Sequence, residues 1–269
     1  MPAVRVRDID FFFTDQGTGE PVLFIHGLTW DHTLWDHQIA ALRGRYRCIA
    51  VDLIGHGSTP DAEHDYTFFD LADYMAGLLD ALNIERAHIV GLSMGGMTAM
   101  PMALVHPGKV RSLALLDTDA QPEGAEKAAA YQQLATAALT HGWAAIAEPV
   151  SQILFAQPFL SDPANRQDVI AKLSANHPPN TVRALRTVTG REDISGRIGA
   201  IRVPTVVIVG ELDIATTPDR AEAMASAIPG ATLVTIPGAG HHSPLEEPAA
   251  VTAALEAHLA RASNAVPSA

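Results

Sequence analysis

Cysteine is almost absent from this chain, because Cys48 is the single one among 269 residues. A lone thiol excludes a disulfide within the chain and a metal site rich in cysteine. Cys48 lies in an apolar run, so we expect a buried, unreactive thiol. The 12 histidines form no H-x-x-x-H motif and no cluster with cysteine. The sequence therefore gives no reason to expect a metal.

Basic residues and long apolar runs are scarce as well. The chain carries 18 lysines and arginines against 30 acidic residues, for a net charge of −12. An acidic chain without a basic run is a poor partner for nucleic acid or an anionic membrane. Every apolar run falls short of the roughly 20 residues that span a bilayer, and no signal peptide is apparent. We therefore expect a cytoplasmic protein that binds neither nucleic acid nor membranes.

What the chain does contain is a hydrophobic fraction of 48%, ample for a large core. Short apolar runs alternate with helical spacing, which predicts β-α-β units and a mostly parallel sheet flanked by helices. Residues 4–13 alternate and then become aromatic, which favours one or two antiparallel edge strands. The other expected strands are 22–25, 47–51, 87–90, 110–116, 205–209 and 231–236. The expected helices are 35–42, 68–82, 96–105, 217–228 and 244–260.

The alternation of strands and helices stops after Asp117 and resumes near residue 205. The stretch between contains helical segments but no convincing strand, which indicates a helical insertion and not a second domain with its own sheet. We therefore predict an α/β core over residues 1–118 and 201–269, with the insertion over residues 119–200, after the sixth strand.

The motif GLSMGG, residues 91–96, is the most informative stretch. It reads G-x-S-x-G between an apolar run and a helix-compatible segment, so Ser93 lies at the apex of a strand-turn-helix. A turn this tight crowds neighbouring Cβ atoms, so small residues belong two positions before and after the serine. The turn would present the Ser93 hydroxyl as a nucleophile. By itself, the motif also fits an ordinary serine in a glycine-rich turn.

A serine nucleophile needs a base, and histidine titrates near the working pH. The histidine in turn needs a carboxylate that fixes its tautomer and offsets its charge. Such groups gather at the carboxyl ends of parallel strands. The last two expected strands end in the turn 210–213 and in a glycine-framed His241. We predict Ser93, Asp213 and His241 as nucleophile, acid and base.

Two of these roles have alternatives. Asp213 could instead cap the helix that follows it, and Asp117 or Asp119, after another strand, would then be the acid. His242 adjoins His241, and only one of the two can face the serine. The flanking glycines favour His241.

Two backbone N–H groups are the expected oxyanion donors. Met94 follows the serine directly, and the strand 22–25 ends in a loop that places Leu28 near the same space. Donors of this kind stabilise the negative oxygen that forms during acyl transfer. We expect His26, in the same loop, to form structural hydrogen bonds and not to bind substrate.

These pieces together resemble the α/β-hydrolase superfamily along nearly the whole chain. The matching pieces are His26-Gly27, the D-x-x-G-H-G-S loop 52–58, GLSMGG, the turn 210–213, and the segment 238–241 with Glu246 and Pro248 beyond. The resemblance implies a Ser93, Asp213 and His241 triad, oxyanion donors at Leu28 and Met94, and an insertion that forms a cap over the active site. His56 belongs to the family's loop but is not catalytic there.

Within the superfamily, the chain most resembles the 3-oxoadipate enol-lactonase and small esterase branch. The similarity lies in the GLSMGG motif, the PGA turn 229–231 and the short insertion. It implies a serine hydrolase that cleaves a small to medium carboxylic ester or lactone through an acyl-enzyme on Ser93, without a cofactor. A serine nucleophile argues against the haloalkane dehalogenases and epoxide hydrolases, which use aspartate.

Other functions share this frame. They are those of the perhydrolases (non-metal haloperoxidases), the C–C bond hydrolases and the acyl-homoserine lactonases. Some proteins of the fold are small-molecule receptors with a slow or inactive triad. Because all three triad positions are filled and both glycine turns are intact, the sequence favours an enzyme.

The substrate pocket is expected to involve the insertion. Arg183 and Arg186 could reach a substrate carboxylate or lie in solvent, and the chain could form a homo-oligomer. Aromatic and apolar residues could line the pocket or pack the insertion onto the sheet; they are Trp30, Tyr131, Trp143, Ile153, Leu154, Phe155 and Phe159.

Overall fold

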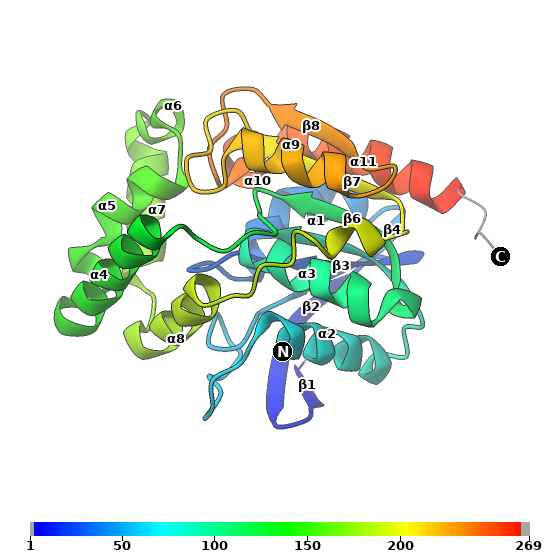
Figure 1. Ribbon diagram of the computed structural model, residues 1–269, viewed down its shortest axis with the longest axis horizontal. Coiled ribbons are helices and arrows are strands. Elements are labelled where there is room, and N and C mark those ends of the chain that lie inside the picture. Colours follow the sequence, from blue (N-terminus) through cyan, green and yellow to red (C-terminus); the bar gives the residue numbers. More distant parts are fainter. Residues whose placement is uncertain (1–2, 265–269) are drawn as a thin grey trace.

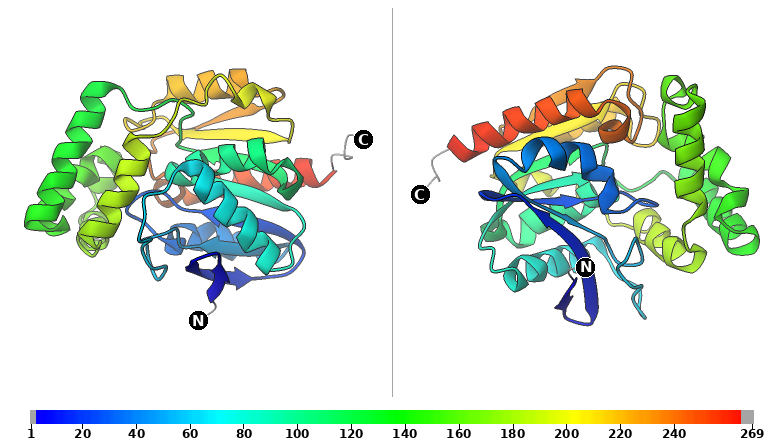
Figure 2. Two further views of the ribbon diagram at one scale, coloured as in Figure 1. Left: turned by 60° about the horizontal axis from the view of Figure 1, so that its bottom comes forward. Right: turned by 180° about the vertical axis from the view of Figure 1, so that it is seen from behind.

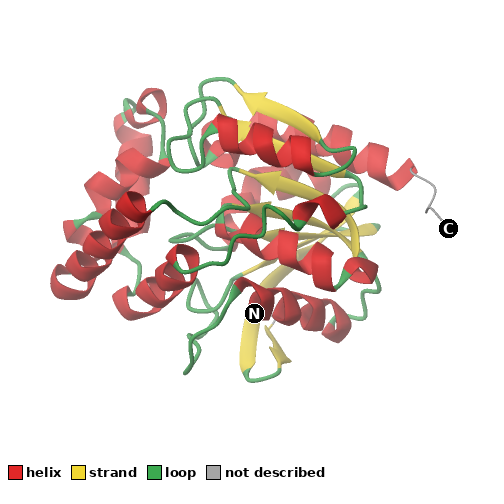
Figure 3. Ribbon diagram, viewed as in Figure 1, coloured by secondary structure: helices red, strands yellow, loops and turns green. Residues whose placement is uncertain are grey.

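The computed structural model describes residues 3–264. Its strands form one sheet in the order β1-β2-β4-β3-β5-β6-β7-β8 (Figures 1 and 3). β1 pairs antiparallel with β2, and β2 with β4, whereas the other neighbouring pairs are parallel. The strands are β1 (Ala3–Val6), β2 (Ile9–Gln16), β3 (Glu20–Ile25), β4 (Tyr46–Val51), β5 (Ala87–Leu92), β6 (Val110–Leu116), β7 (Thr205–Gly210) and β8 (Thr232–Ile236).

Apolar side chains on both faces explain the parallel part of the sheet. β5 and β7 read AHIVGL and TVVIVG, and every residue in them is buried. Runs of this kind are typical of parallel strands that helices cover on both sides. β8, at one edge, reads TLVTI and is mostly exposed. The β1–β2 hairpin forms the opposite edge, which confirms the antiparallel strands predicted for residues 4–13.

Helices cover both faces of the sheet (Figure 2). α2 (Phe68–Ala81), α3 (Met94–Val105) and α9 (Pro218–Ala227) share one hydrophobic core with the sheet. α1 (Asp36–Leu42) and α11 (Pro248–Asn264) pack in a second core on the other face. None of the helices in the described range is both long and apolar enough to cross a membrane.

Five α-helices separate β6 from β7, and they gather at one end of the sheet (Figure 1). They are α4 (Ala125–His141), α5 (Ala147–Leu154), α6 (Gln157–Leu160), α7 (Pro163–Ser174) and α8 (Pro178–Thr189). We call this group the cap. Its two connections to the sheet touch each other, because Ile194 N–H donates to the Ala120 carbonyl at 3.1 Å. The mostly parallel sheet and the helical cap after the sixth strand confirm the predicted fold class, while the bounds 1–118, 119–200 and 201–269 stay a prediction.

Some expected helices differ in their limits. The segment 244–260 is not one helix, because α10 (Ser243–Glu246) ends before α11 begins. Pro248 disfavours the helical conformation of the residue before it, and Glu247 adopts φ −132° and ψ 63°. A 3-10 turn over His32–Trp35 replaces the start expected for α1.

Candidate active site

Ser93 lies at the apex of a tight turn between β5 and α3. Its φ of 52° and ψ of −114° belong to a conformation that non-glycine residues rarely adopt. The turn brings the start of α3 against the sheet, and a Cβ on Gly95 would lie 2.1 Å from the Ile25 carbonyl oxygen. A Cβ on Gly91 would lie 2.4 Å from the Gly95 carbonyl carbon. Glycine is therefore required on both sides of the serine, as the motif predicts.

Hydrogen bonds to the neighbouring strand hold this conformation. Ser93 N–H donates to the Leu116 carbonyl at 2.9 Å, and the Thr118 hydroxyl donates to the Ser93 carbonyl at 2.8 Å. Met97 N–H donates to the same carbonyl at 2.9 Å. Because these bonds fix the backbone, the serine side chain is presented in one direction.

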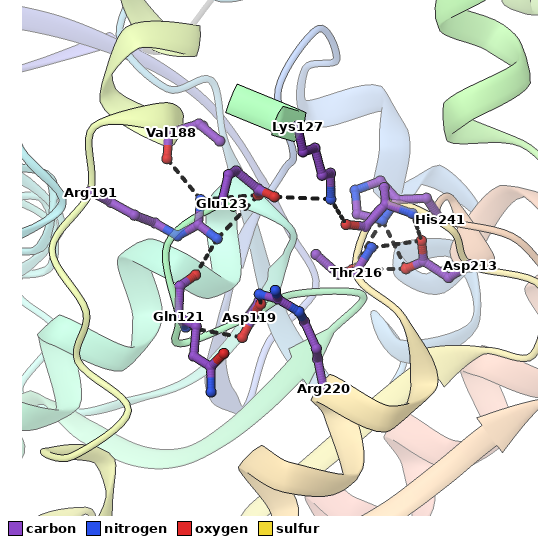
Figure 4. A network of polar contacts seen from close by, with 11 residues as sticks. Asp119, Gln121, Glu123, Lys127, Val188, Arg191, Asp213, Thr216, Arg220 and His241 are labelled. Atoms are coloured by element: carbon purple, nitrogen blue, oxygen red, sulfur yellow. Dashed lines mark hydrogen bonds and ion pairs between the residues drawn. The ribbon is translucent and has the colours of Figure 1, made fainter. Parts of the chain in front are cut away.

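His241 and Asp213 are joined by a hydrogen bond at the ends of β8 and β7 (Figure 4). His241 Nδ1 lies 2.9 Å from Asp213 Oδ2, and both side chains are buried. Asp213 Oδ1 accepts from the N–H groups of Ala215, at 2.7 Å, and Thr216, at 3.0 Å. The Thr216 hydroxyl donates to Oδ2 at 2.8 Å. A carboxylate at Nδ1 assigns the proton to that nitrogen and leaves Nε2 as the basic atom.

The two charges shift each other's pKa. Burial by itself would lower the pKa of His241, but the charge of Asp213 and its hydrogen bond raise that pKa above the usual value. Burial would likewise raise the pKa of Asp213, yet the His241 charge and the hydrogen bonds lower it. The pair therefore favours an ionised Asp213 beside a histidine that accepts protons readily.

Asp117 and Asp119, the alternative acids, have other partners. Asp117 accepts from Gly210 N–H at 2.8 Å and from the Ser243 hydroxyl at 2.5 Å. Burial, followed by the charge of Asp213, raises the pKa of Asp117 well above its usual value. Asp119 forms an ion pair with Arg220. Of the three aspartates, Asp213 is the one hydrogen-bonded to His241.

His242 points into aromatic surroundings. Its ring stacks on Phe155 with centroids 4.7 Å apart and lies 5.0 Å from the Trp30 ring. Burial and the nearby charge of His241 lower the pKa of His242 to about 3. Among the described residues, neither ring nitrogen has a hydrogen-bond partner. His242 thus stays neutral at ordinary pH.

Glu246 organises the loop that carries both histidines. Its carboxylate accepts from the N–H groups of Gly240, at 2.9 Å, and His242, at 3.1 Å. It also accepts from Ala156 N–H of the cap, at 2.9 Å. The sequence marked Glu246 as part of the family pattern without a role, and its contact with Ala156 joins segments 90 positions apart.

Leu28 borders the same cavity as Ser93, and Met94 follows the serine as the first residue of α3. Within residues 3–264, neither backbone N–H donates to another backbone group. His26 supports the Leu28 loop, since its Nδ1 lies 2.7 Å from the Gly27 carbonyl and its Nε2 accepts from Leu53 N–H at 2.9 Å. His26 is therefore a structural residue, as expected.

A cavity of about 80 Å³ lies between Ser93, His241 and the cap. The cap lines this cavity from α4, α5 and α8, and the lining includes Tyr131, Ile153 and Leu154, which the sequence offered as possible pocket residues. Glu123, just before α4, also lines the cavity, together with the cap residues Tyr131, Leu134, Ala135, Trp143, Val150, Ile153, Leu154, Leu185 and Val188.

Three of the five aromatic residues proposed for the pocket do not border this cavity, whereas Tyr131 and Trp143 line it. Trp30 and Phe155 pack instead against His242, which does line it, and Phe159 stacks on Phe155 at 5.4 Å. They lie behind the cavity wall because the cap buries their rings against one another.

Arg183 and Arg186 also lie outside the cavity beside Ser93. They border a second hollow of about 560 Å³ between α8 and the starts of α2 and α3. Arg183 is already paired with Asp61 at 3.1 Å and Asp65 at 3.0 Å. This placement corrects the suggestion that these arginines meet a substrate carboxylate beside the serine.

The described residues hold one group that could in principle bind a cation. It comprises Asp31, His32 and Asp52. Their ligand atoms already have partners: Asp31 pairs with Lys172, and Asp52 accepts from His32 Nδ1 at 2.8 Å and Ser58 N–H at 2.8 Å. These bonds give the cluster a structural role in the loop.

Comparison with known proteins shows which family the chain belongs to. The family model described as alpha/beta hydrolase fold matches residues 20–248. The chain belongs to the α/β-hydrolase family. It is 29% identical to 3-oxoadipate enol-lactonase 1 of Acinetobacter baylyi over 84% of each chain.

Solved structures agree with this assignment. A thermophilic esterase from Thermogutta terrifontis is 33% identical, with a TM-score of 0.88 over 94% of each chain. The enol-lactonase from Burkholderia xenovorans is 27% identical, with a TM-score of 0.90 over 96% of this chain and 100% of that one. Together these similarities identify the chain as a hydrolase of the enol-lactonase and esterase branch.

The glycines of the serine turn allow a test of its geometry in this hydrolase. We expect Gly95→Ala to destabilise the fold by about 3 kcal/mol and to lower Tm by about 10 °C, because the new methyl group overlaps backbone. Gly108→Ala is the control, since a Cβ there meets nothing within 4 Å. Thermal unfolding of both variants measures the difference, and equal Tm values would contradict the close approach.

Proposed function

We propose that this hydrolase cleaves a small to medium carboxylic ester or lactone through an acyl-enzyme on Ser93. The observation that carries the proposal is the Asp213–His241 hydrogen bond of 2.9 Å beside a serine on a strained turn. Ser93 and His241 line the same cavity. A nucleophile, a base and an orienting acid in this arrangement support acyl transfer.

The reaction proceeds in two halves. His241 Nε2 takes the Ser93 hydroxyl proton while Ser93 Oγ bonds to the substrate carbonyl carbon. The bond from that carbon to the leaving oxygen then breaks, and the leaving oxygen receives the proton from Nε2. In the second half, Nε2 takes a proton from water as the hydroxide adds to the acyl carbon. Ser93 Oγ leaves with that proton, and the acid is released.

Backbone groups stabilise the charge that develops in this reaction. The N–H groups of Leu28 and Met94 are the proposed donors to the negative oxygen of each tetrahedral intermediate. Met94 opens α3, so the positive end of the helix dipole adds to their effect. Because both donors belong to the backbone, they are fixed before substrate binds.

The cavity supports an apolar acyl or lactone ring. Its lining is mostly aliphatic and aromatic, with contributions from α4, α5 and α8. Two of the similar proteins carry the names enol-lactonase and esterase. This lining favours an apolar acyl group or lactone ring over a charged one.

Removal of the nucleophile tests the proposal directly. We expect wild type to gain one fluorophosphonate adduct by intact mass and to turn over p-nitrophenyl acetate or a γ-lactone repeatedly. Ser93→Ala should lose both properties, because no other group supplies the attacking oxygen. Ser58→Ala, at an exposed loop position, is the control and should match wild type.

Three other results would contradict the proposal. Activity that persists in Ser93→Ala would place the nucleophile elsewhere. An adduct without turnover would favour a receptor. Peroxide-dependent halogenation faster than ester cleavage would favour a perhydrolase.

Paired substitutions test the acid. Asp213→Asn should lower kcat by about a thousandfold or more, because an amide at this position favours the wrong His241 tautomer. The kcat of Asp117→Asn should stay within about tenfold of the wild-type value. Asp117 makes no hydrogen bond to His241, and the amide keeps the size of its side chain. The reverse ranking in steady-state kinetics would assign the acid to Asp117.

The raised pKa of His241 predicts the pH dependence. The base must be neutral, so kcat/KM should fall as the pH drops through a pKa above the ordinary value of ~6.5. In Asp213→Asn the acidic limb of the residual kcat/KM should shift to lower pH, because the carboxylate that favours the imidazolium is gone. A pH–rate profile that does not move would contradict the assignment of the limb to His241.

A further inference from the structure

A buried ion pair joins the two connections between cap and sheet (Figure 4). Glu123 and Arg191 have side chains only 5% and 4% exposed, and their charged atoms lie 3.2 Å apart. Arg191 also donates to the Val188 carbonyl at 2.7 Å and to the Gln121 carbonyl. Because burying two charges is costly, this pair needs further partners, and Gln121 in the first connection and Val188 near the end of α8 provide them.

Lys127 extends the ion pair towards the catalytic groups. It lies in the first turn of α4, and its Nζ is 2.9 Å from Glu123 Oε2. The same Nζ donates to the Ala215 carbonyl. One ammonium group thus connects a cap helix with the loop after β7.

Ala215 belongs to the loop that holds the proposed acid. Its N–H donates to Asp213 Oδ1 at 2.7 Å, while its carbonyl accepts from Lys127. Thr216 follows directly and donates both its N–H and its hydroxyl to Asp213. A shift of Ala215 therefore moves donors that orient the Asp213 carboxylate.

We propose that Lys127 is a positioning residue that couples the cap to the alignment of Asp213 with His241. This inference rests on the function proposed above. With α4 in place, the Ala215 carbonyl is held, and the N–H groups of Ala215 and Thr216 face Asp213. Displacement of α4 removes this support, so the His241–Asp213 pair is best aligned when the cap is in place over the cavity.

Lys127 also acts on His241 through its charge. The groups that influence the protonation of His241 are Asp213 and Asp117, which favour it, and Lys127, which opposes it. His242 is neutral beside it, and Glu246 lies in the same loop. Loss of the ammonium charge should therefore raise the pKa of His241, a change that a purely structural contact would not cause.

Lysine substitutions separate the positioning role from a structural one. Lys127→Met keeps the length of the side chain and removes its charge and its donors. We expect kcat to fall by about tenfold and KM to change by less than about twofold, because alignment and not binding is lost. The acidic limb of kcat/KM should move to higher pH. Lys127→Arg should restore most of the wild-type kcat and most of the wild-type pH dependence.

A matched control comes from the far side of the molecule. Lys109 is half-buried and paired with Asp80, and it touches no part of the proposed site. Lys109→Met should keep wild-type kcat and pH profile even if Tm falls. A Lys127→Met variant that behaves like this control would overturn the proposal, because its role would then be structural.

A spectroscopic measurement distinguishes failure of this inference from failure of the proposed function. The His241 Nδ1 proton, bonded to a buried carboxylate, should give a low-field signal in the proton NMR spectrum. We expect the signal to weaken or shift in Lys127→Met and to persist in Lys127→Arg and Lys109→Met. An unchanged signal in Lys127→Met would overturn the coupling, whether or not the wild type turns over esters.

Discussion

Asp213 and His241 are buried ionisable groups that follow neighbouring strands, and each stabilises the charged form of the other. Without the carboxylate, burial would lower the pKa of His241 and leave a poor base. Without the histidine, burial would raise the pKa of Asp213. The donors of Ala215 and Thr216 complete the carboxylate's hydrogen bonds. The reactivity proposed for this site depends on that mutual compensation.

The serine reaches this pair through a backbone conformation that is unfavourable in isolation. Ser93 is held at a positive φ because β6 supplies an acceptor for its N–H, and because Gly95 lets the helix approach the end of β3. Strain at a functional residue persists when the surrounding structure fixes it. The same turn aims the serine and the start of α3 at one cavity, so the proposed nucleophile and the proposed oxyanion donor Met94 arise from one local feature.

The cap does more than cover the cavity. Its helices provide most of the apolar wall, and Lys127, paired with Glu123, donates to the Ala215 carbonyl in the loop of the proposed acid. Glu246 makes the corresponding connection on the histidine side, through Ala156 N–H. Both loops that carry the proposed acid and base are thus bonded to the cap, which links substrate enclosure with the geometry of the reacting groups.

The sequence by itself determined the elements whose signals are local. Apolar runs predicted the strands, and the glycines around Ser93 predicted the turn. Because parallel strands place their carboxyl ends together, residues at those ends indicated Asp213 and His241 as candidates. Only the tertiary structure decided which histidine meets the aspartate, and that Trp30 lies behind the cavity wall. It also brought Lys127 to Ala215 across 88 positions of the chain. Such contacts depend on how the cap packs on the sheet, and no local pattern of residues encodes that packing.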